Sequence, residues 1–276
     1  MNSTAFSLIL VSAAIHAGWN LLLKKHTGNL FVLWVGLLIP GVLISSWGIA
    51  SGEIGLESKG LEYLVASGIV HALYFYLLSI CYSKGEISLV YPITRGTAVG
   101  AACIGAWFLF EENISTLGYL GIALVVLGVF AIQGTKANRS DFRLVSLSIL
   151  AGAFSGLYSI IDKVGSQFIS PLPYNGGFFL ISALCLSPIV LKRHKLAEIT
   201  GAFIPGLQIG FGIITCYILV LYAYSFGELS YIVPTREVSV LFGAILGWRF
   251  LNEKIGKAKV IGIAIILFGI TLIKFT

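Results

Sequence analysis

The sequence predicts an all-α integral membrane protein of ten transmembrane helices, arranged as two inverted five-helix repeats. Three observations support this fold. Charged residues make up only 11% of the 276-residue chain, and its mean hydropathy is +0.95, whereas soluble domains carry about 25% charged residues. Runs of about 20 nearly uncharged residues recur along the chain, and each is long enough to cross a bilayer as a helix. A stretch of sequence also occurs twice, half a chain apart.

The apolar runs define ten expected spans with short polar connections. The polar residues 134–142 join the two halves, so we expect a first repeat over 1–134 and a second over 143–276 within one membrane domain. The expected spans cover approximately residues 4–23, 30–50, 61–82, 89–110, 115–133, 143–161, 174–191, 201–225, 230–249 and 256–274.

The repeated stretch is the strongest internal signal. Residues 81–95 read CYSKGEISLVYPITR, and residues 223–236 read AYSFGELSYIVPTR. The two stretches align at an offset of 142 residues. Dropping one residue, Ile93, from the first copy changes the offset to 141, and this offset pairs Glu112 with Glu253. A half-chain repeat in a membrane protein is typical of transporters, whose substrate site lies where the halves meet.

The charges of the connections predict that the halves are inverted, as an odd number of spans in each half requires. The loops after spans 2 and 4 hold one basic residue, Lys59, whereas the equivalent loops of the second half hold seven. Over the whole chain, 13 basic residues fall on one face and three on the other. Because basic loops stay in the cytoplasm, we expect both termini outside and a location in the inner (cytoplasmic) membrane.

Spans 1 and 6 carry matching polar faces. His16, Trp19 and Asn20 share one face of span 1 at helical spacing. An offset of 139 matches Trp19 to Tyr158 on span 6. Such groups either join helices by hydrogen bonds or line a substrate path. Because histidine titrates near neutrality, His16 is a candidate proton carrier, with a packing role as the alternative.

Spans 3 and 8 supply rings that we expect to wall a cavity. His71 and Tyr74 lie on span 3, and Tyr217 lies on span 8. The four cysteines all lie in apolar segments and show no CxxC or His-Cys spacing. We therefore expect neither a disulfide nor a metal site.

Spans 4 and 9 each carry an arginine shortly after a proline. Tyr91, Thr94 and Arg95 share a face of span 4, as do Thr235 and Arg236 on span 9. A charge within the membrane is costly and indicates a functional site. The planar guanidinium binds carboxylate or phosphonate oxygens in bidentate fashion. We therefore predict that the two arginines face a small anionic or zwitterionic substrate.

The prolines and acids of these spans give further expectations. We expect Pro92 and Pro234 each to disturb the helix before the arginine. Glu237, the only acid well inside an expected span, is either the coupling residue, which exchanges its arginine partner for a proton or substrate, or a permanent counter-charge to one arginine. Glu112 and Glu253 close spans 4 and 9, and we expect both to be solvated.

The remaining features limit the classes of function. The glycines of spans 5 and 10 predict close helix packing. No Walker motif, GxSxG, HExxH or pair of catalytic carboxylates is present, so we expect no cofactor, no enzyme activity and no use of ATP. The net charge of +6 belongs to basic loops, which gives no reason to expect nucleic acid. The expected partners are a small-molecule substrate and the lipid bilayer, and either a monomer or a homodimer is compatible with the sequence.

Four features of the sequence resemble the EamA-type drug/metabolite transporters. They are the G-E-x-S-x-x-Y-P-x-T-R stretch, the glutamate after it, the Gly-spaced span that follows, and the H-A-x-W-N-x-x-x-K opening at His16 to Lys24. The resemblance covers nearly the whole chain. It implies ten helices in two inverted repeats, a central cavity lined by spans 1, 3, 4, 6, 8 and 9, and export or uptake of small metabolites.

Two details of the resemblance bear on function and topology. The arginine after the proline and the H-A-x-W-N opening also resemble a branch of permease-like proteins linked with phosphonate use. Members of the family are often drawn with both termini in the cytoplasm, opposite to the charge count given above. The alternative to a secondary transporter is a membrane-embedded enzyme or an accessory subunit of a larger membrane complex.

Overall fold

Every regular element in the described part of the chain is helical. The structure is a computed structural model, and it describes residues 1–276 except 27–28, 56–58, 85–86, 133–141, 195–197 and 252–255. The helices in chain order are α1 Ser3–Lys25, α2 Leu30–Ala50, α3 Leu61–Lys84, α4 Ile87–Phe110, α5 Thr116–Ala131, α6 Phe142–Gly165, α7 Pro171–Leu191, α8 Ile199–Tyr224, α9 Leu229–Thr235, the 3₁₀ turn η2 Arg236–Val238, α10 Ser239–Leu251 and α11 Lys257–Lys274.

The predicted class of fold, an all-α membrane protein, is confirmed. Within the described residues, eight segments are long and apolar enough to cross a membrane, and each expected span contains a helix. Of the two remaining helices, α5 is apolar but has only 16 residues, and α11 carries three lysines. The protein is therefore a multi-pass membrane protein.

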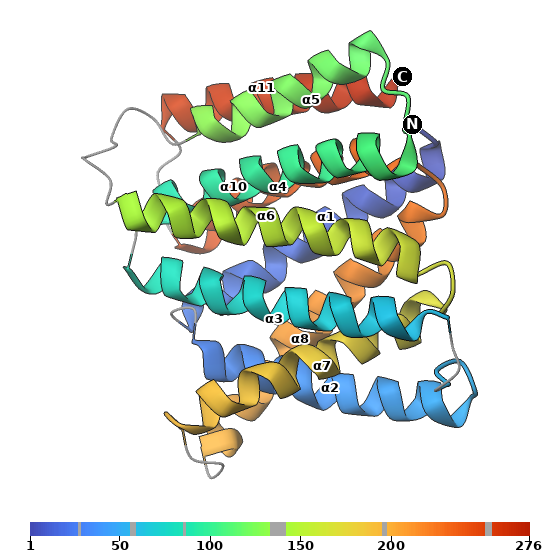
Figure 1. The fold of residues 1–276 in the computed structure, drawn as a ribbon. Coiled ribbons are helices and arrows are strands. Elements are labelled where there is room, and N and C mark those ends of the chain that lie inside the picture. The colour runs from blue at the N-terminus through green and yellow to red at the C-terminus, as the bar shows by residue number, and fades with distance from the viewer. Residues whose placement is uncertain (27–28, 56–58, 85–86, 133–141, 195–197, 252–255) are drawn as a thin grey trace.

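The helices form one bundle in which sequence-distant helices are neighbours (Figure 1). Helices α5 and α11 lie side by side along one side of the bundle, and α2, α7 and α8 lie on the opposite side. Between them α6 packs against both α3 and α4, and α1 packs against α8. Both termini lie at the same end of the bundle (Figure 1), where the Met1 amino group donates to the Lys274 carbonyl at 3.4 Å.

Glycines bring α5 and α11 into backbone contact, as the sequence predicts. A Cβ placed on Gly121 would lie 2.8 Å from the Gly269 carbonyl oxygen, and one placed on Gly128 would lie 2.8 Å from the Gly262 carbonyl oxygen. Real Cβ atoms do not approach backbone so closely. Small residues at such crossings let helices associate in a membrane by close packing.

Gly128→Ala should destabilise the protein by about 1–3 kcal/mol, because the new methyl group forces the two backbones apart. Gly100→Ala is the matched control, since a Cβ there meets no atom within 4 Å and alanine favours a helix by about 1 kcal/mol over glycine. Thermal unfolding in detergent should therefore shift in opposite directions for the two variants. A shift in the same direction for both would contradict this account of the α5–α11 contact.

The segment around Arg236 departs from a regular α-helix. After Pro234, residues Arg236–Val238 form a single 3₁₀ turn before α10 begins. Helix α4 continues through the equivalent Pro92, so a 3₁₀ turn follows the proline in the second half only. Helices α2, α7 and α8 also contain an internal proline. Neighbouring helices can satisfy the carbonyl that a proline leaves without a donor, and a proline alone therefore does not end a helix in this bundle.

Candidate functional site

A small cavity with a largely apolar wall lies between α1, α2, α3 and α4. Its volume of about 30 Å³ holds one or two ordered waters, so a metabolite fits only if the surrounding helices move apart. Six predicted site residues line it, together with five neighbours: His16, Trp19, Asn20, Tyr74, Thr94 and Arg95, with Leu23, Leu33, Phe75, Leu78 and Tyr82. The side chain of the predicted site residue Tyr91 lies outside the described residues.

Some polar groups of the predicted site hydrogen-bond to the backbone. The Asn20 amide donates to the His16 carbonyl at 2.8 Å. The Thr94 hydroxyl donates to a carbonyl of α6 at 3.3 Å, and the Thr235 hydroxyl donates within its own helix at 2.7 Å. Thr235 is fully buried. These contacts position α1, α4 and α9, and the threonine hydroxyls are not free donors for a substrate in this conformation.

Arg95 forms a bidentate ion pair with Glu237. Its Nε donates to Oε2 at 3.1 Å, and its Nη2 donates to Oε1. Glu237 is fully buried, and Arg95 is 6% exposed. The pair joins α4 in the first half to η2 in the second. In this structure Glu237 therefore has the second of its two expected roles, that of a counter-charge to one arginine. The repeat places Gly96 where the second half has Glu237, so this acid has no counterpart in the first half.

Arg236, the equivalent arginine of the second half, contacts an aromatic ring instead of an acid. Its guanidinium carbon lies 5.5 Å from the centre of the Tyr217 ring, and the residue is only 7% exposed. In the part of the chain that the structure describes, its side chain takes part in no hydrogen bond and no ion pair. A cation held this way retains its donors for a ligand, and a membrane-buried guanidinium is costly unless it serves a function.

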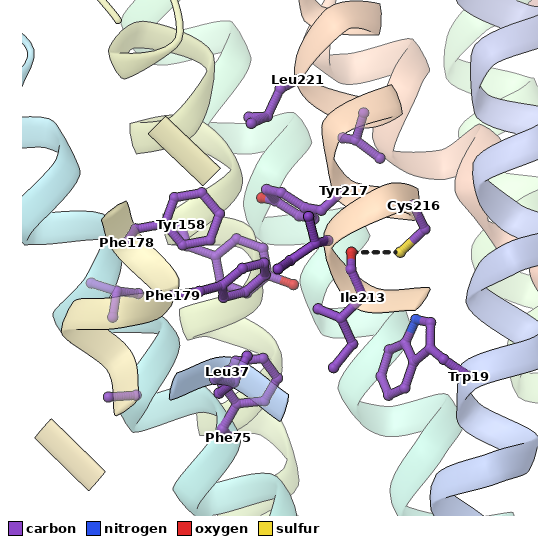
Figure 2. Close-up of a cluster of buried hydrophobic side chains, with 14 of the residues drawn as sticks. Trp19, Leu37, Phe75, Tyr158, Phe178, Phe179, Ile213, Cys216, Tyr217 and Leu221 are labelled. Atoms are coloured by element: carbon purple, nitrogen blue, oxygen red, sulfur yellow. Dashed lines mark hydrogen bonds between the residues drawn. The ribbon is translucent and has the colours of Figure 1, made fainter. Parts of the chain in front are cut away.

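An aromatic cluster adjoins Arg236, and Figure 2 shows its members Tyr158, Phe178 and Tyr217. His71 stacks on Tyr158 with ring centres 3.8 Å apart and on Phe178 at 4.5 Å. Tyr217 meets the His71 ring edge-on at 5.6 Å, and Tyr74 meets Tyr158 edge-on at 5.5 Å. These rings come from α3, α6, α7 and α8. The structure thus brings together the ring residues that the sequence assigned to a cavity wall.

Asp162 is a buried acid that the sequence analysis did not select. The residue is fully buried in α6, which extends to Gly165, four residues beyond the expected end of span 6. Glu237 is therefore not the only acid inside a span. The Asp162 carboxylate accepts hydrogen bonds from the hydroxyls of Ser67, Tyr217 and Tyr174, the last at 3.1 Å. The sequence signal for Asp162 is its helical spacing from Ser155, Tyr158 and Ser159 on span 6.

Glu112 closes the end of the bundle near the termini. Its carboxylate accepts from Lys163 Nζ at 2.7 Å and from the backbone N–H groups of Leu229 and Ser230 at 2.8 and 3.0 Å. Glu112 is 7% exposed, so the expectation of a solvated carboxylate is wrong. The first N–H groups of a helix lack intrahelical partners and attract an anion, here the start of α9. Glu253 lies outside the described residues.

The charge of Glu112 is fixed by these contacts. Burial raises the pKa of its carboxyl, but the hydrogen bonds from Lys163, Ser230 and Leu229 outweigh burial and hold the pKa below its ordinary value. The carboxylate is thus ionised at neutral pH and ties α6, α9 and the α4–α5 connection together. We call this arrangement the Glu112–Lys163 clamp.

The likeness to known proteins assigns this all-helical membrane bundle to the class of membrane transporters. Residues 143–275 match the model of the EamA-like transporter family. The resemblance to the EamA-type drug/metabolite transporters is thereby confirmed, and the match covers nearly all of the second half of the chain.

Known proteins agree with this class. YwfM of Bacillus subtilis (strain 168), an uncharacterized transporter, is 23% identical over 243 residues, which are 86% of this chain and 81% of that protein. The quaternary ammonium compound-resistance protein QacE of Escherichia coli is 25% identical over 104 residues, which are 37% of this chain and 89% of that protein. These names indicate a transporter rather than an enzyme. None of these matches supports the branch linked with phosphonate use.

The fold also has a close counterpart. A solved crystal structure superposes with a TM-score of 0.71 over 98% of this chain and 96% of its own, at 16% sequence identity. At this identity the likeness concerns the fold alone.

Proposed function

We propose that the protein is a secondary transporter of the inner (cytoplasmic) membrane that carries a small polar metabolite with an anionic or zwitterionic charge. The observation that carries this proposal is Arg236. It is a buried guanidinium between the two halves, and among the described residues it has no hydrogen-bond or ion-pair partner. A carboxylate or phosphate would complete its fork of donors.

The substrate site would extend from Arg236 to the cavity next to Arg95. A charge-assisted hydrogen bond contributes about 1.5–3 kcal/mol, and this would anchor the anionic group. The other predicted residues would shape the pocket through aromatic rings and polar edges: His16, Trp19, Asn20, His71, Tyr74, Tyr91, Thr94, Tyr158, Tyr217 and Thr235. The present cavity volume of about 30 Å³ agrees with a site that opens only when the two halves move apart.

We infer that the halves 1–134 and 143–276 are inverted repeats. The helix contacts support this arrangement, because equivalent helices pack on one another: α5 on α11, and α2 on α7. Other contacts occur in matching pairs, such as α3 with α6 and α8 with α1. The match of QacE to little more than a third of this chain also agrees with a unit of about half its length.

We propose that the end of the bundle with both termini faces the outside, as the basic residues of the opposite connections favour. The Glu112–Lys163 clamp would then close the outer end. The described structure would be a conformation shut toward the outside.

Uptake into proteoliposomes that contain only this protein tests the proposed function. The panel is labelled L-glutamate, pyruvate, glucose 6-phosphate and tetraethylammonium. We expect at least one anionic or zwitterionic compound to enter faster than into protein-free liposomes and to be recovered chemically unchanged. Chemical conversion of the compound would favour a membrane enzyme, and uptake of tetraethylammonium alone would contradict the anionic substrate class.

A further inference from the structure

We propose that Asp162 is the group that takes up a proton during transport, so that the carrier moves its anionic substrate together with a proton. This inference rests on the proposed transport function and assigns its coupling ion. It also gives Glu237 the role of a fixed counter-charge to Arg95.

The first ground is the setting of Asp162. Its side chain is fully buried, and its partners are three hydroxyl groups rather than a cation. No lysine or arginine of the described ranges forms an ion pair with it. A buried carboxylate with neutral partners can exist in both charge states, whereas a nearby opposite charge favours the charged form of a carboxylate.

The second ground is a hydrogen-bonded chain that reaches Asp162. The Nδ1 atom of His71 lies 3.0 Å from the Ser67 carbonyl oxygen and 3.1 Å from the Ser67 hydroxyl. Because a carbonyl only accepts, this nitrogen carries the proton of the neutral ring. The Ser67 hydroxyl in turn donates to Asp162 Oδ1. A proton that reaches Nε2 of His71 can therefore release the Nδ1 proton to the Ser67 hydroxyl, whose own proton passes to Asp162 Oδ1.

The geometry also accommodates the proton once it arrives. A proton on Oδ1 turns this acceptor into a donor, so one of its present donors must turn away. Tyr174 can do so, because its hydroxyl lies 3.1 Å from Oδ1 and 3.4 Å from the Tyr63 carbonyl oxygen. When its hydrogen turns to Tyr63, its oxygen can accept from the new Asp162 O–H. One bond forms at Oδ1, no heavy atom moves far, and no donor loses its acceptor.

The third ground is the connection to the substrate cation. Tyr217 donates through its hydroxyl to Asp162 Oδ2, and its ring lies under the Arg236 guanidinium at 5.5 Å. Arg95 and Glu237 cancel each other, which leaves Arg236 balanced by Asp162. A proton on Asp162 leaves the positive charge of Arg236 uncompensated, and a monoanion then restores neutrality. The empty and the loaded carrier would therefore have the same charge in the membrane.

Among the titratable groups of this region, Asp162 is the best placed to take up the proton. Tyr174, Tyr217, Tyr224 and Arg236 act on it directly from α7, α8 and η2. His71 reaches it through Ser67, and the following residue, Lys163, is turned to Glu112. Arg95 of α4 is engaged by Glu237. Within the described residues no group of three or more His, Cys, Asp or Glu residues could hold a metal ion, and the sodium gradient of the flux test below distinguishes a proton from a sodium ion bound by oxygen atoms.

An infrared titration of purified protein tests the inference without any substrate. We expect the carbonyl-stretch band of a protonated carboxyl to grow as the pH is lowered, and part of that band to be missing from Asp162→Asn. Tyr217→Phe keeps the aromatic ring and removes one donor to the carboxylate, so the midpoint of that part should move to higher pH by up to about one unit. If Asp162→Asn fails to fold, an unchanged midpoint in Tyr217→Phe overturns the inference.

The flux test uses proteoliposomes with the pH dye pyranine inside. Addition of a transported anion from the panel should acidify the interior for the wild type, and an inward proton gradient should speed uptake. Asp162→Asn should lose both effects and keep exchange of labelled for unlabelled anion. Uptake that ignores the proton gradient, or follows a sodium gradient, overturns the inference while leaving transport intact. If no compound of the panel moves, the proposed function fails, and the infrared titration still decides whether Asp162 binds a proton.

Discussion

Replacing Arg236 with glutamine should lower the initial rate of uptake at low substrate concentration by about ten- to a hundredfold. The variant loses a charge-assisted contact with the substrate, which is worth about 1.5–3 kcal/mol. The substitution should leave thermal stability nearly unchanged, because in the described residues the Arg236 side chain holds no hydrogen bond or ion pair with the protein.

The lysine variant provides the control. Arg236→Lys keeps the charge and loses the planar fork, so its uptake rate should fall between those of the wild type and Arg236→Gln. Normal transport by a folded Arg236→Gln would show that this arginine is structural.

Arg95→Gln and Glu237→Gln should each destabilise the protein by about 3–5 kcal/mol, because each leaves one member of a buried ion pair without its partner. Glu237 is fully buried and Arg95 nearly so, so water cannot replace the missing charge. Thermal unfolding in detergent measures this loss.

The double variant Arg95→Met/Glu237→Met should recover most of that stability, since apolar residues of similar size often replace a buried pair at little cost. Additive losses in the double variant would contradict a direct pairing of the two residues. The contrast with Arg236→Gln is informative, since the two arginines occupy equivalent positions of the repeat and are expected to fail in different ways.

The sequence predicted the class of fold and most of the cavity wall. Low charge and apolar runs located the helices, and the repeat identified Arg95 and Arg236 as equivalent positions. The helical spacing of His16, Trp19 and Asn20 placed them on one face, and the structure brings that face to the cavity beside Arg95. These features could be predicted because they depend on local periodicity and on comparison of the halves.

Other features depend on contacts between distant segments. The sequence could not decide whether Glu237 pairs with Arg95 or Arg236, since both are compatible with its position. Glu112 seemed a solvated helix end because the N–H groups that it binds belong to α9, more than a hundred residues away. Asp162 lies at helical spacing from Tyr158, but the hydroxyl groups around it come from α3, α7 and α8, and the sequence does not show that they meet.

The most direct test of the central claim, that Arg236 binds the anionic group of the substrate, is a comparison of two substrates in two proteins. The substrates are the most active anion of the panel and its uncharged methyl ester or amide. The proteins are the wild type and Arg236→Gln in proteoliposomes. We expect the variant to slow uptake of the anion by about ten- to a hundredfold and to leave uptake of the neutral analogue unchanged. An equal loss for both compounds would contradict contact between Arg236 and the substrate's charge.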